Sequence, residues 1–316
     1  MEYTQISELA KSLRTNIGKV IIGKEDKIEL ILTAMLAGGH ILLEDVPGTG
    51  KTTLAKALAK SLTCDFSRIQ FTPDLLPSDI TGTRIYNREN NTFTFIKGPA
   101  FTNILLADEI NRATPRTQSA LLECMEERQI TEGGITYPLE APFLVIATQN
   151  PVETQGTFRL PEAQLDRFLI QISLGYPDKA EAVQLLERFI RQQPLAELTP
   201  VADATQIVKA AELCTQCEVS KDVMRYMAAI VEAARNPEKV RLGPSPRALL
   251  ALMRCSQVLA AIRGRDYVIP DDVKKLAVPV LAHRIMLRTV SGRDDRSAFV
   301  ESILEAVPAP TEHEHR

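Results

Sequence analysis

Short runs of apolar residues recur five times between residues 40 and 174, and most of them are apolar at consecutive positions. A strand with one face in water alternates apolar and polar side chains, whereas a strand covered by helices on both faces is apolar throughout. Helical stretches lie between several runs, and in one of them Leu54, Leu58 and Leu62 follow the spacing of a helix face. The pattern predicts a doubly wound α/β fold with a five-stranded parallel sheet. The predicted strands are HILLEDV (40–46), DFSRIQF (65–71), NILLADEI (103–110), FLVIATQN (143–150) and FLIQISL (168–174).

The character of the sequence changes near residue 176, where Pro177 and Asp178 precede a series of amphipathic helical stretches. We expect a larger α/β domain over residues 1–176 and a smaller all-α domain over 177–316, with a frayed tail, PAPTEHEHR. Two turns interrupt the first domain and are typical of β-hairpins. The predicted hairpins cover about residues 82–96, around the turn NRENN, and about residues 129–138, around Glu132-Gly133-Gly134.

Composition and charge exclude several classes of protein. Hydrophobic residues make up 45% of the chain and charged residues 24%, which excludes disordered and collagen-like proteins. The longest apolar stretch, residues 30–43, is too short for a membrane span, and the N-terminus lacks the apolar core of a secretory signal, so we expect a cytoplasmic protein. The net charge of −3 does not favour a nucleic-acid partner, although it does not exclude duplex DNA.

The chain has five cysteines, an odd number, with a single CxxC pair formed by Cys214 and Cys217. The sequence has no second pair to complete a zinc site. The segment AAELCTQCEV is typical of a helix and not of the strand-to-helix turn that carries a redox-active pair. We therefore expect five reduced thiols that serve in packing.

The sequence VPGTGKTT follows the first predicted strand and precedes a helix, which is the context of a phosphate-binding loop. Backbone N–H groups of such a loop and the N-terminus of its helix bind phosphate oxygens, the lysine reaches the β and γ phosphates, and the hydroxyl after it binds magnesium. The pattern G-x-x-x-x-G-K-[ST] begins with glycine where this chain has Asp45, so the loop has to accommodate an acidic side chain. The predicted nucleotide-binding residues are Pro47, Gly48, Thr49, Gly50, Lys51, Thr52 and Thr53, of which Thr52 also binds the metal.

Acidic and amide side chains end two other predicted strands. Asp108 ends the third, where its carboxylate can hold magnesium through water, and the adjacent Glu109 can orient and polarise the attacking water. Asn150 ends the fourth, where its neutral amide can hold that water or contact the γ phosphate. The alternative role of Asn150 is a plain strand cap.

Two arginines can complete a phosphate site. Arg167 lies just before the fifth predicted strand beside Asp166, so its alternative role is a local ion pair. Arg247 follows Pro246 in the first turn of a helix of the second domain, which offers backbone N–H groups as well as a guanidinium to a phosphate. Its alternative role is that of an ordinary surface arginine.

The segments VPGTGKTT, LLADEINRA, VIATQNP, LPEAQLDRF and SPRA, in this order and spacing, closely resemble the MoxR group of AAA+ ATPases. The resemblance extends over about residues 15–305. It implies an AAA+ core with a helical lid, assembled into a homo-oligomeric ring, usually a hexamer, with ATP and Mg²⁺ at each subunit interface. It also implies that the hairpin at 82–96 is the helix 2 insert of this group and that the hairpin at 129–138 is its presensor 1 hairpin.

The same resemblance implies a role for each candidate residue. Lys51 and Thr52 match the Walker A pair, Asp108 and Glu109 match Walker B, Asn150 matches sensor 1, Arg167 matches the arginine finger that acts in trans, and Arg247 matches sensor 2. The stretch VIIGKEDKI, residues 20–28, resembles the segment that packs on adenine, with Ile22 and Gly23 as the expected contacts. In the resulting mechanism Glu109 activates water, Lys51 and Arg247 bind phosphate in cis, and Arg167 enters from the adjacent subunit.

The resemblance further implies a magnesium-dependent, chaperone-like motor that remodels or matures partner protein complexes, for example by metal insertion, together with von Willebrand factor A domain proteins. Two alternatives stay open. A nucleic-acid motor or loader would track DNA with a hairpin, and Arg84, Arg88 and Lys97 flank the first hairpin, although Glu89 and Glu132 dilute the positive charge. The ATPase subunit of a metal chelatase shares the same architecture.

Overall fold

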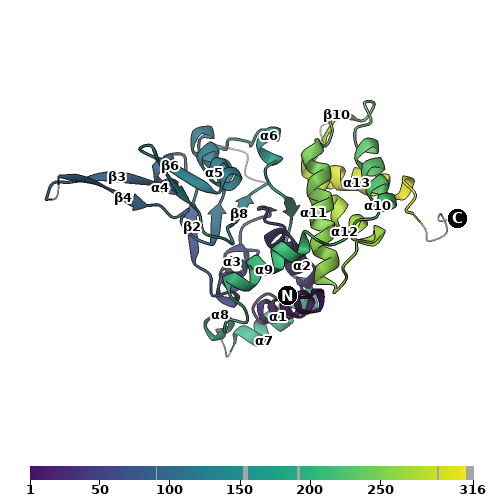
Figure 1. Ribbon diagram of the computed structural model, residues 1–316, viewed down its shortest axis with the longest axis horizontal. Coiled ribbons are helices and arrows are strands. Elements are labelled where there is room, and N and C mark those ends of the chain that lie inside the picture. Colours follow the sequence, from purple (N-terminus) through teal and green to yellow (C-terminus); the bar gives the residue numbers. More distant parts are fainter. Residues whose placement is uncertain (90, 152–155, 191–192, 290–291, 311–316) are drawn as a thin grey trace.

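The computed structural model describes residues 1–89, 91–151, 156–190, 193–289 and 292–310. Figure 1 shows an α/β core, coloured purple to teal, beside a group of helices coloured green to yellow. Asn90 of the predicted NRENN turn and residues 311–316 of the predicted frayed tail lie outside the described residues.

The core is built on a five-stranded sheet in which all strands are parallel. The strand order is β2-β5-β8-β1-β9, so β1 lies between β8 and β9, the two strands that come last along the chain. Each strand lies within one of the predicted apolar runs, which confirms the predicted fold class. The strands are β1 (Ile41–Glu44), β2 (Phe66–Gln70), β5 (Ile104–Asp108), β8 (Leu144–Gln149) and β9 (Ile170–Ile172).

Successive side chains of these strands are buried in two different hydrophobic clusters. Ile41 and Leu43 of β1 pack on one face of the sheet, while Leu42 packs on the other face in the cluster that contains Leu121. Because helices cover both faces, consecutive strand positions are apolar. The first face is covered by α1 (Tyr3–Gly18), α2 (Glu25–Leu36) and α3 (Lys51–Ser61). The second cluster draws on α4 (Pro77–Thr81), the 3-10 helix η1 (Ile110–Arg112), α5 (Pro115–Glu127) and α6 (Glu162–Leu165).

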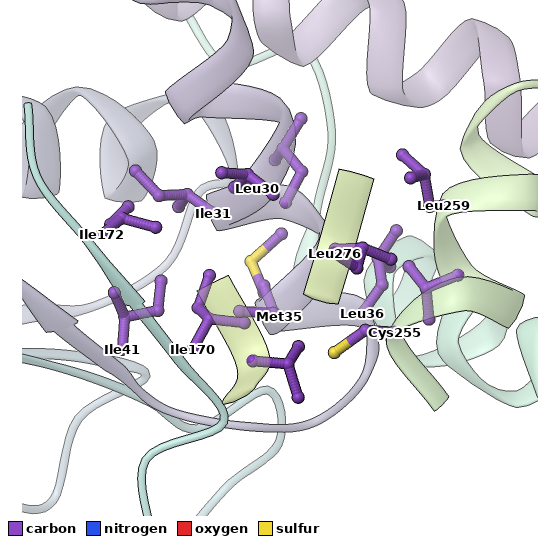
Figure 2. Packing of buried hydrophobic residues seen from close by; sticks show 14 of the residues in the cluster. Leu30, Ile31, Met35, Leu36, Ile41, Ile170, Ile172, Cys255, Leu259 and Leu276 are labelled. Carbon is purple, nitrogen blue, oxygen red and sulfur yellow. The ribbon is translucent and has the colours of Figure 1, made fainter. Parts of the chain in front are cut away.

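The described residues after β9 are mainly helical. They also form a short antiparallel pair, β10 (Val240–Leu242) with β11 (Met286–Leu287), which an all-α description leaves out. Figure 2 shows that the first hydrophobic cluster continues from Ile41 and Ile170 of the sheet to Leu259 and Leu276 of the helical group. The helices are α7 (Lys179–Phe189), α8 (Pro194–Glu197), α9 (Ala204–Cys214), α10 (Lys221–Ala233), α11 (Pro246–Ile262), α12 (Pro270–Leu281), the 3-10 helix η2 (Ala282–Arg284) and α13 (Arg293–Ala306).

Two hairpins extend from the core where the sequence predicts them. β3 (Gly82–Asn87) pairs with β4 (Thr92–Lys97) and projects far from the sheet, as Figure 1 shows. β6 (Gln129–Glu132) pairs with β7 (Ile135–Pro138) directly after α5. The rings of Phe95 on β4 and Tyr137 on β7 stack with centroids 4.5 Å apart and planes at 16°, so the two hairpins contact each other near their bases.

All five cysteines are free thiols. Cys214 ends α9 and Cys217 follows it, and both are buried. Burial raises the pKa of Cys214 to about 12 and that of Cys217 to about 11, so both are held as protonated thiols. Within the described residues, no helix is both long enough and apolar enough to cross a lipid bilayer.

Candidate functional site

The predicted phosphate-binding loop connects β1 to α3 at the carboxyl edge of the sheet. α3 begins at Lys51, and its N-cap Gly50 has a φ of +89°, which a residue with a side chain rarely adopts. Lys51 Nζ donates to the main-chain oxygens of Asp45 at 3.0 Å and Val46 at 3.2 Å, so the lysine curls over the loop. Thr49 Oγ1 also donates to the oxygen of Val46 at 3.4 Å. The remaining predicted residues follow the same path: Pro47 and Gly48 lie in the loop, and Thr52 and Thr53 lie in the first turn of α3.

Asp45, which replaces the expected first glycine, turns its side chain away from the loop. Its carboxylate is buried and accepts hydrogen bonds from Ser173 Oγ at 2.7 Å, from Leu174 N at 2.6 Å and from Gly175 N at 3.0 Å. These three donors follow β9, the strand adjacent to β1. The loop therefore accommodates the acidic side chain by giving it hydrogen-bond partners outside the phosphate site.

Asp108 is fixed by both neighbouring strands. It ends β5, and its Oδ1 accepts a hydrogen bond from Thr148 Oγ1 of β8 at 2.6 Å. Its Oδ2 pairs with the Arg68 guanidinium of β2 at 2.7 Å. Thr148 Oγ1 also accepts from the N–H of Glu109 at 2.8 Å, so one hydroxyl positions both acidic residues.

Glu109 has left-handed backbone geometry, with a φ of +56°, and this turn directs its carboxylate across the end of β2. Gln70 Nε2 donates to Glu109 Oε2 at 2.7 Å, and Arg112 Nη1 pairs with the same oxygen at 3.1 Å. The site residues predicted from the sequence do not include four partners of this acidic pair: Arg68, Gln70, Arg112 and Thr148. Gln70 is aligned with Asp108 in the sheet. Predicting Gln70 as a site residue would have required the pairing of β2 with β5, which one sequence does not reveal.

Asn150 follows β8, at the same edge of the sheet as the phosphate loop. β8 and β1 are aligned with Gln149 beside Glu44, and the N–H of Asp45 donates to the oxygen of Gln149 at 3.1 Å. Asn150 and Glu44 line a cavity of about 730 Å³ between this edge and the C-terminal helices. Burial raises the pKa of Glu44, which accepts a hydrogen bond from Gln171 Nε2 at 2.6 Å.

Arg167 and Arg247 lie together, and both bind Glu126 at the end of α5. Arg167 Nε is 3.1 Å from Glu126 Oε2, and Arg247 Nη2 is 2.9 Å from Glu126 Oε1. Asp166 binds instead the buried Arg284, whose Nε is 2.6 Å from its Oδ1, so the local Asp166–Arg167 pair that the sequence allowed is not formed.

The arginine pair lies at the amino edge of the sheet, opposite the phosphate loop. Arg167 precedes β9, and the neighbouring residue of Glu126, Met125, accepts a hydrogen bond from the ring of His40, which precedes β1. Lys51 follows the other end of β1, and a four-residue strand separates the two edges by about 13 Å. The expectation that Arg247 contacts phosphate in cis is therefore corrected: Arg247 shares its location with Arg167 and not with Lys51.

The predicted adenine segment adjoins the start of α7. Ile22 is buried, and Gly23 has a φ of +69° with the Glu181 side chain so close that any Cβ would overlap it. Lys24 Nζ donates to the oxygen of Tyr176 at 3.2 Å and pairs with Glu181 Oε2 at 3.0 Å. The segment is thus joined to α7 and to Tyr176, which directly follows the residues that bind Asp45.

Two protein families match the chain. The "ATPase family associated with various cellular activities (AAA)" matches residues 40–170, and the "AAA lid domain" matches residues 232–305. The crystal structure of a protein from Cytophaga hutchinsonii has a TM-score of 0.89 with 39% sequence identity, over 98% of this chain and 97% of that one.

Three curated relatives are similar over almost the whole chain. YeaC of Bacillus subtilis is 47% identical, over 94% of this chain and 93% of that protein. Chaperone MoxR1 of Mycobacterium tuberculosis is 41% identical, over 93% and 80% of the two chains, and Protein MoxR of Paracoccus denitrificans is 32% identical, over 92% and 93%. Since these relatives match almost the whole chain and AAA family models match both of its parts, the chain belongs to the MoxR family of AAA+ ATPases, which hydrolyse ATP.

Proposed function

We infer that the chain is one subunit of a homo-oligomeric ring, a hexamer by family resemblance, whose nucleotide sites lie between subunits. The observation that carries this proposal is the separation of Lys51 from the Arg167–Arg247 pair at opposite edges of one sheet. Each subunit thus has half of a phosphate site at each edge. Head-to-tail contacts that close into a ring would bring one edge to the other.

Within this proposal both arginines act in trans. Arg167 and Arg247 share the carboxylate of Glu126, which keeps two like charges side by side at a half-exposed surface. A phosphate of the neighbouring subunit's nucleotide offers the same kind of bidentate acceptor with more negative charge. The role proposed for Arg247 is therefore the same in chemistry as that of a sensor arginine, but it serves the adjacent site.

The loop and the acidic pair supply the chemistry in cis. Lys51 and the N–H groups at the start of α3 would bind the phosphates, and Glu109 would take a proton from the attacking water. Gln70 and Arg112 hold the Glu109 carboxylate in a defined place before the water is bound. Asn150, at the adjacent strand end, would orient that water or the γ phosphate.

The residues present fit a magnesium ion. The hydroxyl of Thr52 and the carboxylate of Asp108 are hard oxygen ligands, and among the described residues no group of three or more His, Cys, Asp or Glu side chains could hold a metal ion by itself. Magnesium is commonly held in this way, by one or two protein oxygens with water and substrate phosphate oxygens. When bound, the ion would neutralise charge on the transferred phosphoryl group.

Ile22 and Gly23 are proposed to contact adenine on the basis of family resemblance, which the buried Ile22 and the contact of Gly23 with Glu181 at the start of α7 support. The division into an ATPase core, residues 1–176, and a lid, residues 177–316, also remains a proposal. It is supported by the segment after β9, which leaves the sheet at residue 173 and begins α7 at Lys179.

The proposed output is mechanical work on a protein client. The β3–β4 hairpin, proposed to be the helix 2 insert, exposes Ile85, Tyr86, Phe93 and Ile96 to solvent, and such side chains suit an unfolded or loosely packed polypeptide. The β6–β7 hairpin is proposed to be the presensor 1 hairpin. We propose that the client is a partner complex that is matured, for example by metal insertion, together with von Willebrand factor A domain proteins; this part rests on family resemblance. We place this activity in the cytoplasm, and the five free thiols suit such a reducing compartment.

Mixing inactive variants tests the shared site. Arg247→Ala subunits would keep their own Glu109, and Glu109→Gln subunits would keep Arg247. In mixed rings some interfaces would combine an intact Glu109 with an intact Arg247, so we expect magnesium-dependent ATP turnover to recover on mixing. Arg167→Ala mixed with Glu109→Gln should behave in the same way.

The controls test whether recovery on mixing requires the two changes to lie in different halves of the site. Mixing Glu109→Gln with Lys51→Ala should restore no turnover, because both changes lie in the same half of the site. If Arg247→Ala is not rescued by mixing while Arg167→Ala is, Arg247 does not act in trans. Stimulation of turnover by single-stranded DNA, but not by an unfolded polypeptide, would favour the nucleic-acid motor over the protein remodeller.

A further inference from the structure

Asp45 makes contacts with three separate parts of the nucleotide-binding core. Its N–H donates to Gln149 at the end of β8, and its main-chain oxygen accepts from Lys51 Nζ at 3.0 Å. Its carboxylate accepts from Ser173 Oγ, Leu174 N and Gly175 N at 2.6 to 3.0 Å. One residue therefore belongs to the phosphate loop through its main chain and to the segment after β9 through its side chain.

The carboxylate is a strong attachment for that segment. Asp45 is 4% exposed and Leu174 is 4% exposed, so water cannot readily replace the hydrogen bonds between them. Hydrogen bonds to a charged acceptor are roughly twice as strong as those between neutral groups. The position of the backbone at residues 173–175 is consequently set by the start of the phosphate loop.

The same segment is held from its other side by the predicted adenine turn. Tyr176 accepts a hydrogen bond from Lys24 Nζ at 3.2 Å, and Lys24 also pairs with Glu181 in the first turns of α7. Glu181 packs against Gly23. The stretch from Ser173 to α7 therefore lies between two elements that would hold the phosphates and the base of one nucleotide.

We propose that Asp45 is a positioning residue that transmits the occupancy of its own phosphate loop to residues 173–175 and to α7. This inference rests on the proposed function. Since Arg247 lies at the opposite edge of the sheet, it provides no contact between this loop and the chain after β9 in the same subunit. When Lys51 turns from the oxygen of Asp45 to a phosphate, the main chain of Asp45 loses a partner, and its carboxylate carries the resulting shift to the segment.

Hydrogen exchange with mass spectrometry tests the proposal on the whole 316-residue chain, with and without a non-hydrolysable ATP analogue and Mg²⁺. In the wild type, the analogue should slow exchange in the loop, residues 45–53, and change exchange in residues 173–185. In Asp45→Asn, which keeps the size of the side chain, loop protection should persist while the response of residues 173–185 is lost. Turnover should fall about tenfold, with KM changed by less than about threefold.

Two further variants make the test specific. Ser173→Ala removes one of the three donors outside the loop and should weaken the response of residues 173–185, which keeps the proposal testable if Asp45→Asn does not fold. Asp178 caps α7 by accepting from Glu181 N at 2.8 Å and is not one of the three donors to Asp45, so Asp178→Ala should speed exchange in α7 equally with and without the analogue.

The outcomes separate this inference from the proposed function. If Asp45→Asn or Ser173→Ala shows the wild-type response of residues 173–185, or if the wild type shows loop protection and turnover without that response, Asp45 does not transmit occupancy. If the wild type shows neither loop protection nor turnover, the proposed nucleotide chemistry itself is refuted, and this inference with it.

Discussion

Replacing Thr148 with valine should lower both the free energy of unfolding and the rate of ATP turnover. Thr148 is fully buried, and its hydroxyl donates to Asp108 at 2.6 Å while accepting from the N–H of Glu109 at 2.8 Å. Valine keeps the volume and the β-branched shape, so the change removes hydrogen bonds without opening a cavity. The bond to the charged Asp108 is worth about 1.5 to 3 kcal/mol, and an unpaired Glu109 N–H costs about 1 to 3 kcal/mol more.

Because Asp108 keeps its ion pair with Arg68 and the two terms are not fully additive, we expect the free energy of unfolding to fall by about 3 kcal/mol. Turnover should fall by about tenfold to a hundredfold, since a small displacement of Glu109 disturbs the alignment of the water. Urea unfolding followed by circular dichroism suits a chain without tryptophan, and phosphate release measures turnover.

Thr33→Val is the matched control. Thr33 is equally buried, but its hydroxyl donates only to the main-chain oxygen of Glu29 within α2, at 2.8 Å. We expect it to cost less than about 1 kcal/mol and to leave turnover unchanged. If Thr148→Val lowers the unfolding free energy no more than Thr33→Val and keeps wild-type turnover, the hydroxyl does not organise the acidic pair.

Three other predictions concern separate parts of the molecule. Glu109→Gln should retain ATP binding and lose nearly all turnover, because the amide cannot accept the proton of water; wild-type turnover would remove Glu109 from the mechanism. Glu126→Ala should change the free energy of unfolding by less than about 1 kcal/mol, because its two arginine partners are partly exposed, and a larger loss in urea unfolding would assign Glu126 a structural role. Burial lowers the pKa of His40 to about 4, so the unfolded chain, with a histidine pKa near 6.5, binds more protons between these values. The free energy of unfolding should therefore fall as pH drops from about 6.5 to 4, by up to about 3 kcal/mol, and His40→Gln should reduce that slope unless the histidine is protonated in the fold.

The local patterns of the sequence were sufficient to predict the strands and both hairpins. Each strand of the sheet lies inside its apolar run because burial on both faces demands apolar residues at consecutive positions, as Ile41, Leu42 and Leu43 show. The turn glycines likewise predicted the hairpin at β6–β7. These features depend on neighbours within a few residues, which a single sequence displays.

The parts that the sequence did not reveal depend on which distant segments meet. Gln70 reaches Glu109 only because β2 pairs with β5, and the partners of Asp45 are donors about 130 positions later in the chain. The motif around Arg247 indicates only a helix start, while the place of this arginine at the amino edge, away from the cis phosphate contact that the resemblance implies, depends on the packing of α11 against α1 and α2. Such contacts depend on tertiary packing and produce no periodic pattern of residues in the sequence.

The stacked rings of Phe95 and Tyr137 join the two hairpins, so a movement of one hairpin would move the other. Glu126, which holds the arginine pair, lies only three residues before β6, so in the proposed ring a displacement of that carboxylate would tilt the β6–β7 hairpin. The stack would pass that tilt to β4 near its base, and the length of the β3–β4 hairpin would enlarge it along the strands away from the core. A displacement at Arg167 and Arg247 that is too small to disturb the core would thus become a larger movement in the part of the β3–β4 hairpin farthest from the sheet.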